Sequence, residues 1–297
     1  MTSPRGSLPA VPLGPASVRR ALLREIRAAA AGIDRSTPTP TLVHDTRKRI
    51  KRARAGLALL RPALTEQDYA QCDAALRAAG RALSALRDAT VMRKTEARIR
   101  ARAGLPPAPP PVTPSRIRGA ETLGRERARK AHAHLVTAAA RLSDAHVLGR
   151  GWARLGTGGR AVYRGGRRRL ASAETEPSSE RLHAWRRHVK RLWHVLELFD
   201  VVNPRRIGPA IADARRLSQT LGEEHDLAML AARIRRRRPR TADDDGMLRV
   251  IAERRIQLTR RALRLGAKVY DDPPRAFEKR LREEWQRAAG TRRALPV

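Results

Sequence analysis

Two stretches of the chain carry histidine and cationic side chains at a spacing that would gather them on one face of a helix. At about 100° per residue, each set falls within one sector of the helix or flanks it. The first set, the first stripe, comprises His44, Arg47, Lys48, Lys51, Arg52 and Arg54. The second stripe comprises His183, Arg186, Arg187, Lys190, Arg191 and His194. Guanidinium and ammonium groups bind phosphate oxygens strongly, so each stripe is typical of an anion-binding surface.

The stripes belong to a longer internal repeat. The segment VHDTRKRIKRARAGLALL aligns with LHAWRRHVKRLWHVLELF, and the later segment LRDATVM aligns with EHDLAML. The distance from His44 to Asp88 is 44 residues, and the distance from His183 to Asp226 is 43 residues. In both copies apolar residues occupy the helix face opposite the stripe. Two copies of one helical unit are the simplest explanation.

A charged helix face is more often a solvated surface than a ligand site. Neither stripe contains an acidic residue, however, and like charges at positions i and i+4 repel each other by about 0.2 to 0.5 kcal/mol. A face that only keeps a protein in solution usually mixes both signs. Because the same arrangement occurs twice, we favour a surface that binds a polyanion and predict that its affinity falls steeply with salt.

The composition agrees with an anionic partner. Among 297 residues, Lys and Arg number 64 and Asp and Glu number 29, so the formal net charge is +35. The single cysteine, Cys72, excludes an internal disulfide and a cysteine metal site, which fits a reducing cytoplasm. No run approaches the roughly 18 apolar residues of a membrane span. The Pro-rich residues 1–14 predict a disordered tail rather than a signal peptide.

Ala, Leu, Arg and Glu dominate between breaks rich in Pro and Gly, and strand patterns are absent, so the sequence predicts an all-α fold. The expected helices cover residues 15–33, 41–62, 66–101, 116–143, 157–174, 179–200, 204–237, 243–270 and 274–290. Residues 104–114 predict an extended polyproline connector. The glycine-rich residues 149–159 predict a break that divides the chain into two halves. Thr65 and Asn203 have the positions of helix N-caps.

Two charged clusters have structural explanations. Residues 233–240, RIRRRRPR, predict a solvated helix end, where cations suit the helix dipole. Asp243, Asp244 and Asp245 precede an apolar periodic segment, so they indicate N-terminal capping rather than a metal site.

At the stripes the sequence resembles the CHAD family, the conserved histidine α-helical domain, whose helices carry the pattern H-x-x-R-x-x-x-[KR]-R twice. The matching residues are His44, Arg47, Lys51 and Arg52 in the first copy and His183, Arg186, Lys190 and Arg191 in the second. The likeness extends to Arg87-Asp88, to Tyr163-Arg164 with Arg167 to Arg169, and to GAKVYDDPPRAF at 266–277, and it covers about residues 15–290. The second copy departs from the first at His225, which stands in place of Arg87.

The resemblance implies two antiparallel four-helix bundles related by a pseudo-twofold axis, with an extra C-terminal helix. The expected domain covers residues 15–297, with a first bundle at 15–148 and a second at 157–297. A basic cavity between the bundles would accommodate inorganic polyphosphate, without a cofactor, a metal or catalysis. The predicted polyphosphate-binding residues are those of both stripes together with Tyr163, Arg164, Arg167 and Arg168.

Three other functions suit a basic helical protein. Non-specific nucleic-acid binding needs only positive charge, but aromatic residues make up 3% of the chain and no base-reading motif occurs. A structural role on a polyphosphate granule or an anionic membrane is the second alternative. A polyphosphate-cleaving enzyme is the third, and it lacks a carboxylate cluster for Mg²⁺. We expect a cytoplasmic protein associated with granules, and no feature of the sequence indicates an oligomeric state.

Overall fold

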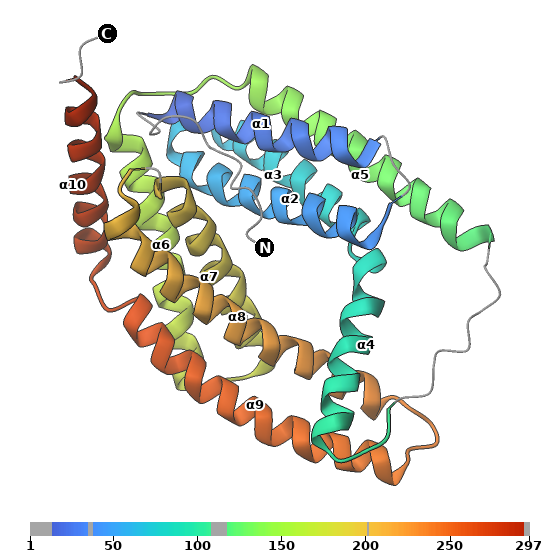
Figure 1. Ribbon diagram of the computed structural model, residues 1–297. Coiled ribbons are helices and arrows are strands. Elements are labelled where there is room, and N and C mark those ends of the chain that lie inside the picture. The colour runs from blue at the N-terminus through green and yellow to red at the C-terminus, as the bar shows by residue number, and fades with distance from the viewer. Residues whose placement is uncertain (1–13, 35–37, 108–117, 201, 294–297) are drawn as a thin grey trace.

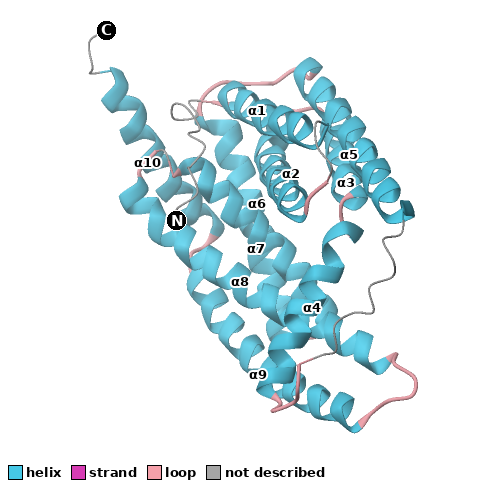
Figure 2. Cartoon of the chain, turned by 45° about the vertical axis from the view of Figure 1, so that its right-hand side comes forward, coloured by secondary structure: helices cyan, strands magenta, loops and turns pink. Residues whose placement is uncertain are grey.

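A computed structural model of the protein describes residues 14–34, 38–107, 118–200 and 202–293, without the side chains of 34, 85–91, 118–121 and 290–293. Every regular element in these ranges is a helix, which confirms the all-α prediction (Figure 2). The α-helices are α1 (Pro15–Asp34), α2 (Pro40–Leu60), α3 (Glu66–Ala82), α4 (Ala85–Arg102), α5 (Arg118–Asp144), α6 (Trp152–Thr175), α7 (Ser179–Phe199), α8 (Pro204–Arg235), α9 (Ala242–Val269) and α10 (Pro274–Arg293). A short 3-10 helix covers Arg61–Ala63.

Side-chain caps begin several of these helices. The side chains of Thr39, Thr65, Ser178 and Asn203 each accept a hydrogen bond from the backbone amide three residues later. Thr241 and Asp244 form a reciprocal capping box at the start of α9. Such bonds satisfy amides that have no partner within the helix. The N-caps predicted at Thr65 and Asn203 and the capping role of the acidic cluster are confirmed.

The predicted helix at 66–101 is wrong as a single element, because the chain breaks it at Leu83 and Ser84 into α3 and α4. Leu83 is fully buried, and the Ser84 hydroxyl donates to the carbonyl of Arg81. The two segments bury different apolar surfaces. α3 packs on α5, whereas α4 packs on α8 and α9. A straight helix could not reach both partners.

The predicted break at 149–159 is also wrong over most of its length, since α6 begins at Trp152. Its glycines permit close helix packing. A Cβ added at Gly158 would lie 2.0 Å from the carbonyl oxygen of Leu59 at the end of α2. Close approach of two backbones, which only glycine allows here, compensates for its low helix propensity.

The helices pack in two groups around a shared interior (Figure 1). α1, α2, α3 and α5 lie together, and α6 to α10 form the second group. α2 also contacts α6 and α7, and one buried apolar cluster includes Leu57 and Leu135 of the first group and Leu192 of the second. The division into bundles at 15–148 and 157–297 and the pseudo-twofold axis between them stay predictions.

α4 reaches from the first group to α8 and α9 (Figure 1). A second, separate apolar cluster joins Ile99 of α4 to residues of α8 and α9, among them Leu230, Ile234 and Ile251. These contacts bury an apolar surface that α4 cannot cover within the first group.

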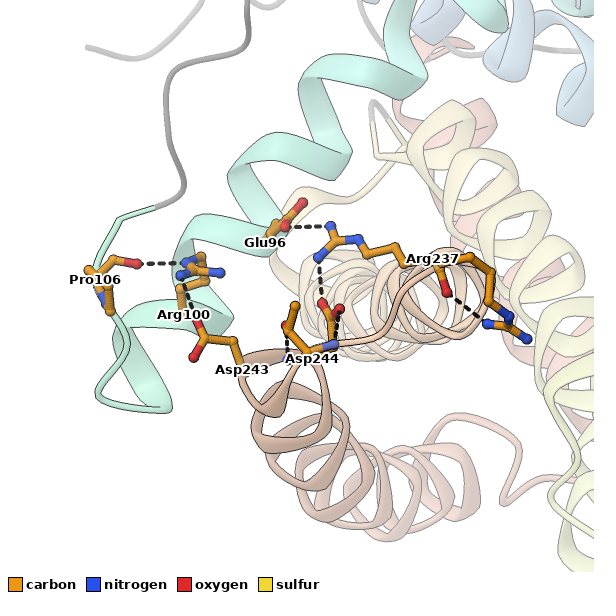
Figure 3. Close-up of polar contacts among 8 residues, drawn as sticks. Glu96, Arg100, Pro106, Arg237, Asp243 and Asp244 are labelled. Carbon is orange, nitrogen blue, oxygen red and sulfur yellow. Dashed lines mark hydrogen bonds and ion pairs between the residues drawn. The ribbon is translucent and has the colours of Figure 1, made fainter.

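Ion pairs reinforce this contact, and we call them the α4 clasp (Figure 3). Arg237 reaches Glu96 of α4 at 2.6 Å and Asp244 at 2.7 Å. Arg100 binds Asp243 at 3.0 Å and donates to the carbonyl of Pro106. The prediction that residues 233–240 form a solvated end is therefore wrong for Arg237, because acids from two other elements neutralise it.

Parts of the sequence predictions lie outside the described residues. These are residues 1–13 of the predicted tail, residues 108–114 of the predicted connector, and the side chains of Arg87 and Asp88.

Candidate anion-binding surface

The two stripes lie on helices that pack against each other, although 139 residues separate His44 from His183. α2 carries the first stripe and α7 carries the second (Figure 1). Arg52 Nε lies 3.5 Å from Glu197 Oε2 of α7. The charge of Lys48 also acts on Glu197. The fold therefore joins cations from both copies into one region, which sequence spacing could not show.

Acids from neighbouring helices hold part of the first stripe. Arg54 Nε lies 2.8 Å from Asp73 Oδ1 of α3, and Arg77 binds the same carboxylate at 3.2 Å. Arg191 of α7 is within electrostatic reach of Arg54 and Asp73. Neither stripe contains an acid, but in the folded protein acids from neighbouring helices lie beside the first stripe. Asp73 keeps two guanidinium groups oriented beside a third.

Arg47 has a positioning contact. Its Nη1 donates to the carbonyl oxygen of Gly80 at 2.9 Å, near the end of α3. Lys48 and Arg187, by contrast, are exposed. These long side chains can therefore meet a ligand without leaving a buried contact.

A pair of histidines lies beside the second stripe. His183 Nδ1 of α7 and His225 Nδ1 of α8 are 3.2 Å apart, and their ring centroids are 4.4 Å apart. Burial, followed by the charges of Arg186, His183 and Lys190, lowers the pKa of His225 to about 4. Burial and the charges of Arg187 and Arg186 lower the pKa of His183. His225 was not among the predicted site residues, although its place in the repeat, where the first copy has Arg87, marked it.

Two predicted polyphosphate-binding residues, His194 and Tyr163, are buried in the structure. His194 is 4% exposed, stacks on Trp193 and contacts Glu197 Oε2 through Nδ1 at 2.9 Å. Tyr163 is 1% exposed, stacks on Phe277 and donates to the carbonyl of Asp272. Both positions face a neighbouring helix, which the helical spacing alone could not show.

Glu197 has a lowered pKa beside this histidine. Burial opposes ionisation, but the hydrogen bond with His194 and the charges of His194, Arg52 and Lys48 outweigh it. Burial lowers the pKa of His194, and the contact with Glu197 offsets part of that effect. Glu197 is therefore an ionised acid that links α7 to Arg52 of α2.

Three predicted residues of α6 are exposed, namely Arg164, Arg167 and Arg168. The charge of Arg167 acts on Tyr163. Arg168 and its exposed neighbour Arg169 act electrostatically on His188 of α7, as do Arg187 and Arg191. Burial and these four charges lower the pKa of His188 to about 4. Arg169 was part of the family resemblance, but neither it nor His188 was a predicted site residue, and the packing of α6 on α7 brings them together.

Comparison with known protein families decides the relationship. The CHAD domain matches residues 18–235, well over half of the chain. The chain belongs to the CHAD family. This CHAD match includes both stripes and ends with α8, whereas the resemblance noted in the sequence extended to about residue 290. Comparison with curated proteins gave no match.

No group of three or more His, Cys, Asp or Glu side chains in the described part of the chain could hold a metal ion. No helix among the described residues is long and apolar enough to cross a membrane. Within this CHAD domain, exposed cationic side chains occur on α2, α6 and α7.

Proposed function

We propose that this CHAD protein binds inorganic polyphosphate, without cleaving it, on the joined stripes of α2 and α7. The observation that carries the proposal is the contact between these two helices, which places cations from both copies of the repeat in one region. A linear polyanion offers a negative charge on every unit and can engage many of these cations at once. Its binding relieves their mutual repulsion and releases counterions.

The aromatic residues favour polyphosphate over single-stranded nucleic acid. All four Trp, three Tyr and two Phe lie within the described residues, and each is buried or half-buried. Sequence-tolerant binding of single strands uses aromatic side chains on which bases stack. A polyanion without bases needs only the cations that this surface supplies.

The decisive experiment compares binding of long-chain polyphosphate to three forms of the protein at constant salt. The site variant combines Lys48→Gln, Lys51→Gln, Arg187→Gln and Lys190→Gln. The control variant removes the same number of charges from exposed positions on α1 and α9, through Arg24→Gln, Arg27→Gln, Arg260→Gln and Arg264→Gln. We expect the site variant to lose about 100-fold or more in affinity and the control to lose much less.

DNA added as a competitor separates the proposal from its main alternative. Polyphosphate binding should persist in the presence of excess DNA. Equal displacement by DNA, or equal losses in both variants, would indicate a generic polycation. Circular dichroism spectra must show that both variants remain helical, because an unfolded variant would make the comparison invalid.

The non-catalytic part of the proposal has its own test. Incubation with polyphosphate and Mg²⁺ should release no phosphate, because catalysis of phosphoryl transfer depends on placed metal ions and orienting groups. We also propose a cytoplasmic location on polyphosphate granules. Cosedimentation with granules, but not with anionic liposomes, is the expected result.

A further inference from the structure

The His183–His225 pair joins the second stripe to α8 in an unusual electrostatic setting. The two Nδ1 atoms are 3.2 Å apart, so one imidazole can donate to the other only if their tautomers differ. A shared hydrogen bond of this kind needs one unprotonated Nδ1. The hydrogen-bonded pair can therefore carry at most one positive charge, which is one proton fewer than two imidazolium rings would carry.

The charged residues near the pair are cations on α7 and acids on α8. From α7, Arg186, Arg187 and Lys190 act on the pair. On α8, Asp226 follows His225, and two acids precede it. Those acids are engaged by α9, with Glu223 bound to Arg254 and Glu224 bound to Arg255. The cations of α7 therefore dominate the field at the pair.

Other elements packed on α7 and α8 place their described charges elsewhere. Lys48 and Arg52 of α2 face Glu197, fourteen residues beyond His183. Arg168 and Arg169 of α6 act on His188. The α4 clasp holds Glu96 and Arg100 against Arg237 and Asp243, toward the far end of α8.

The repeat shows what is particular about this position. The first copy has Arg87, a permanent cation, where the second copy has His225. At this position of the repeat, the first copy has a residue of fixed charge and the second copy has a residue whose charge can change by a proton.

We propose that the His183–His225 pair takes up a proton when a polyanion binds the second stripe, so that binding strengthens as pH falls. This inference rests on the proposed function and adds a regulation to the same surface. The polyanion supplies the negative charge that offsets Arg186, Arg187 and Lys190, and it thereby stabilises the protonated pair. The proton comes from solvent, and no covalent bond changes.

The sign of the effect follows from linkage. In the free protein burial and then Arg186 lower the pKa of His225 to about 4, so the pair is uncharged near neutral pH. In the complex its pKa is higher, because negative charge favours the protonated form. Between the two pKa values the complex holds one more proton, and affinity rises by up to about tenfold for each pH unit of acidification. Above the pKa of the complex this dependence vanishes.

A metal ion is the less suitable ligand for the same pair. Two imidazole nitrogens at this distance could chelate a dication, but three cations of α7 surround them. No third metal-ligating side chain completes a cluster among the described residues.

The test measures the affinity for long-chain polyphosphate at constant ionic strength from about pH 5.5 to about pH 8, where histidine titrates. Wild type should gain at least about tenfold on acidification. His225→Gln should bind with little pH dependence and more weakly than wild type at the acidic end. His225→Arg restores the residue of the first copy. Its affinity should also vary little with pH but should be high at the alkaline end of the range. His134→Gln on α5 should keep the wild-type slope.

Calorimetry in two buffers of different ionisation enthalpy measures the same proton directly. Wild type should take up about one proton at mildly acidic pH, and His225→Gln close to none. A flat wild-type profile, or an undiminished slope in His225→Gln, would overturn the inference while leaving polyphosphate binding intact. A wild type that binds at no pH would instead refute the proposed function.

Discussion

The first and second stripes have similar sequences, but their charged side chains have different contacts and neighbours. The first has Arg52 and Arg54, each paired with a carboxylate from another helix, and Arg47, which donates to a carbonyl oxygen. The second contains or adjoins four histidines with lowered pKa values: His183, His188, His194 and His225. Trp193 stands at the position in the repeat that corresponds to Arg54. Both copies therefore have a cationic helix face, but more histidines lie within or beside the second one.

The largest effect should come from separating α6 from α2, the helix that carries the first stripe. Gly158→Ala places a Cβ 2.0 Å from the carbonyl oxygen of Leu59, and backbone cannot yield as a flexible side chain can. We expect a loss of about 3 kcal/mol in the free energy of unfolding and weaker polyphosphate binding through both stripes.

Gly246→Ala is the matched control for this change. A Cβ at Gly246 of α9 meets nothing within 4 Å, so it should raise stability by about 0.5 to 1 kcal/mol. Urea denaturation measures the free energy of unfolding of both variants. Equal stabilities would show that the α2–α6 contact is looser than described.

The next effect distinguishes the stripes from each other. Lys48→Gln with Lys51→Gln weakens the first stripe, and Arg187→Gln with Lys190→Gln weakens the second. Each pair should cost about tenfold or more in affinity and reduce the dependence on salt by one to two counterions, roughly as for nucleic acids.

The pH dependence of these two losses should differ. Removing Lys190 relieves a repulsion that lowers the pKa of His225, so part of the loss in the second stripe should be recovered on acidification. The loss in the first stripe should stay constant with pH. Affinities at about pH 6 and pH 8 test this, and parallel losses would contradict a difference between the stripes.

A smaller effect concerns the acids that hold the first stripe. Asp73→Asn removes a carboxylate shared by Arg54 and Arg77, so stability should fall by about 1 kcal/mol after allowance for solvent exposure. Polyphosphate affinity should rise by a few fold, because the local positive potential increases. Thermal unfolding and binding are measured on the same sample. Lower affinity would show that Asp73 orients the guanidinium groups for the ligand.

The sequence predicted those features that depend on local spacing. Both stripes, the all-α fold and the caps at Thr65 and Asn203 follow from periodicity and from hydrogen bonds within a turn. The CHAD resemblance was also visible in these residues, and the family match confirms it. A cationic face opposite an apolar face needs no knowledge of the partner helix.

The features that sequence reasoning missed depend on distant contacts. Residues 66–101 are rich in helix formers, and Gly80 and Ser84 alone were too weak a signal for the break at Leu83, where α4 turns toward α8. Residues 149–156 indicate a loop by glycine propensity, but α6 already begins at Trp152. His194 shares the angular sector of the stripe, yet a neighbouring helix covers it. The pair formed by His225 requires α8 to lie beside α7.

The α4 clasp has a consequence for the order of events during synthesis. Glu96 and Arg237, which it joins, are 141 residues apart in the chain. At about 20 residues per second, the faster end of translation rates, roughly 7 s pass before Arg237 follows Glu96 out of the ribosome's active centre. For most of that interval the residues of α8 and α9 that cover Ile99 have not yet been synthesised. The nascent first half therefore presents an apolar helix face to chaperones until the second half arrives.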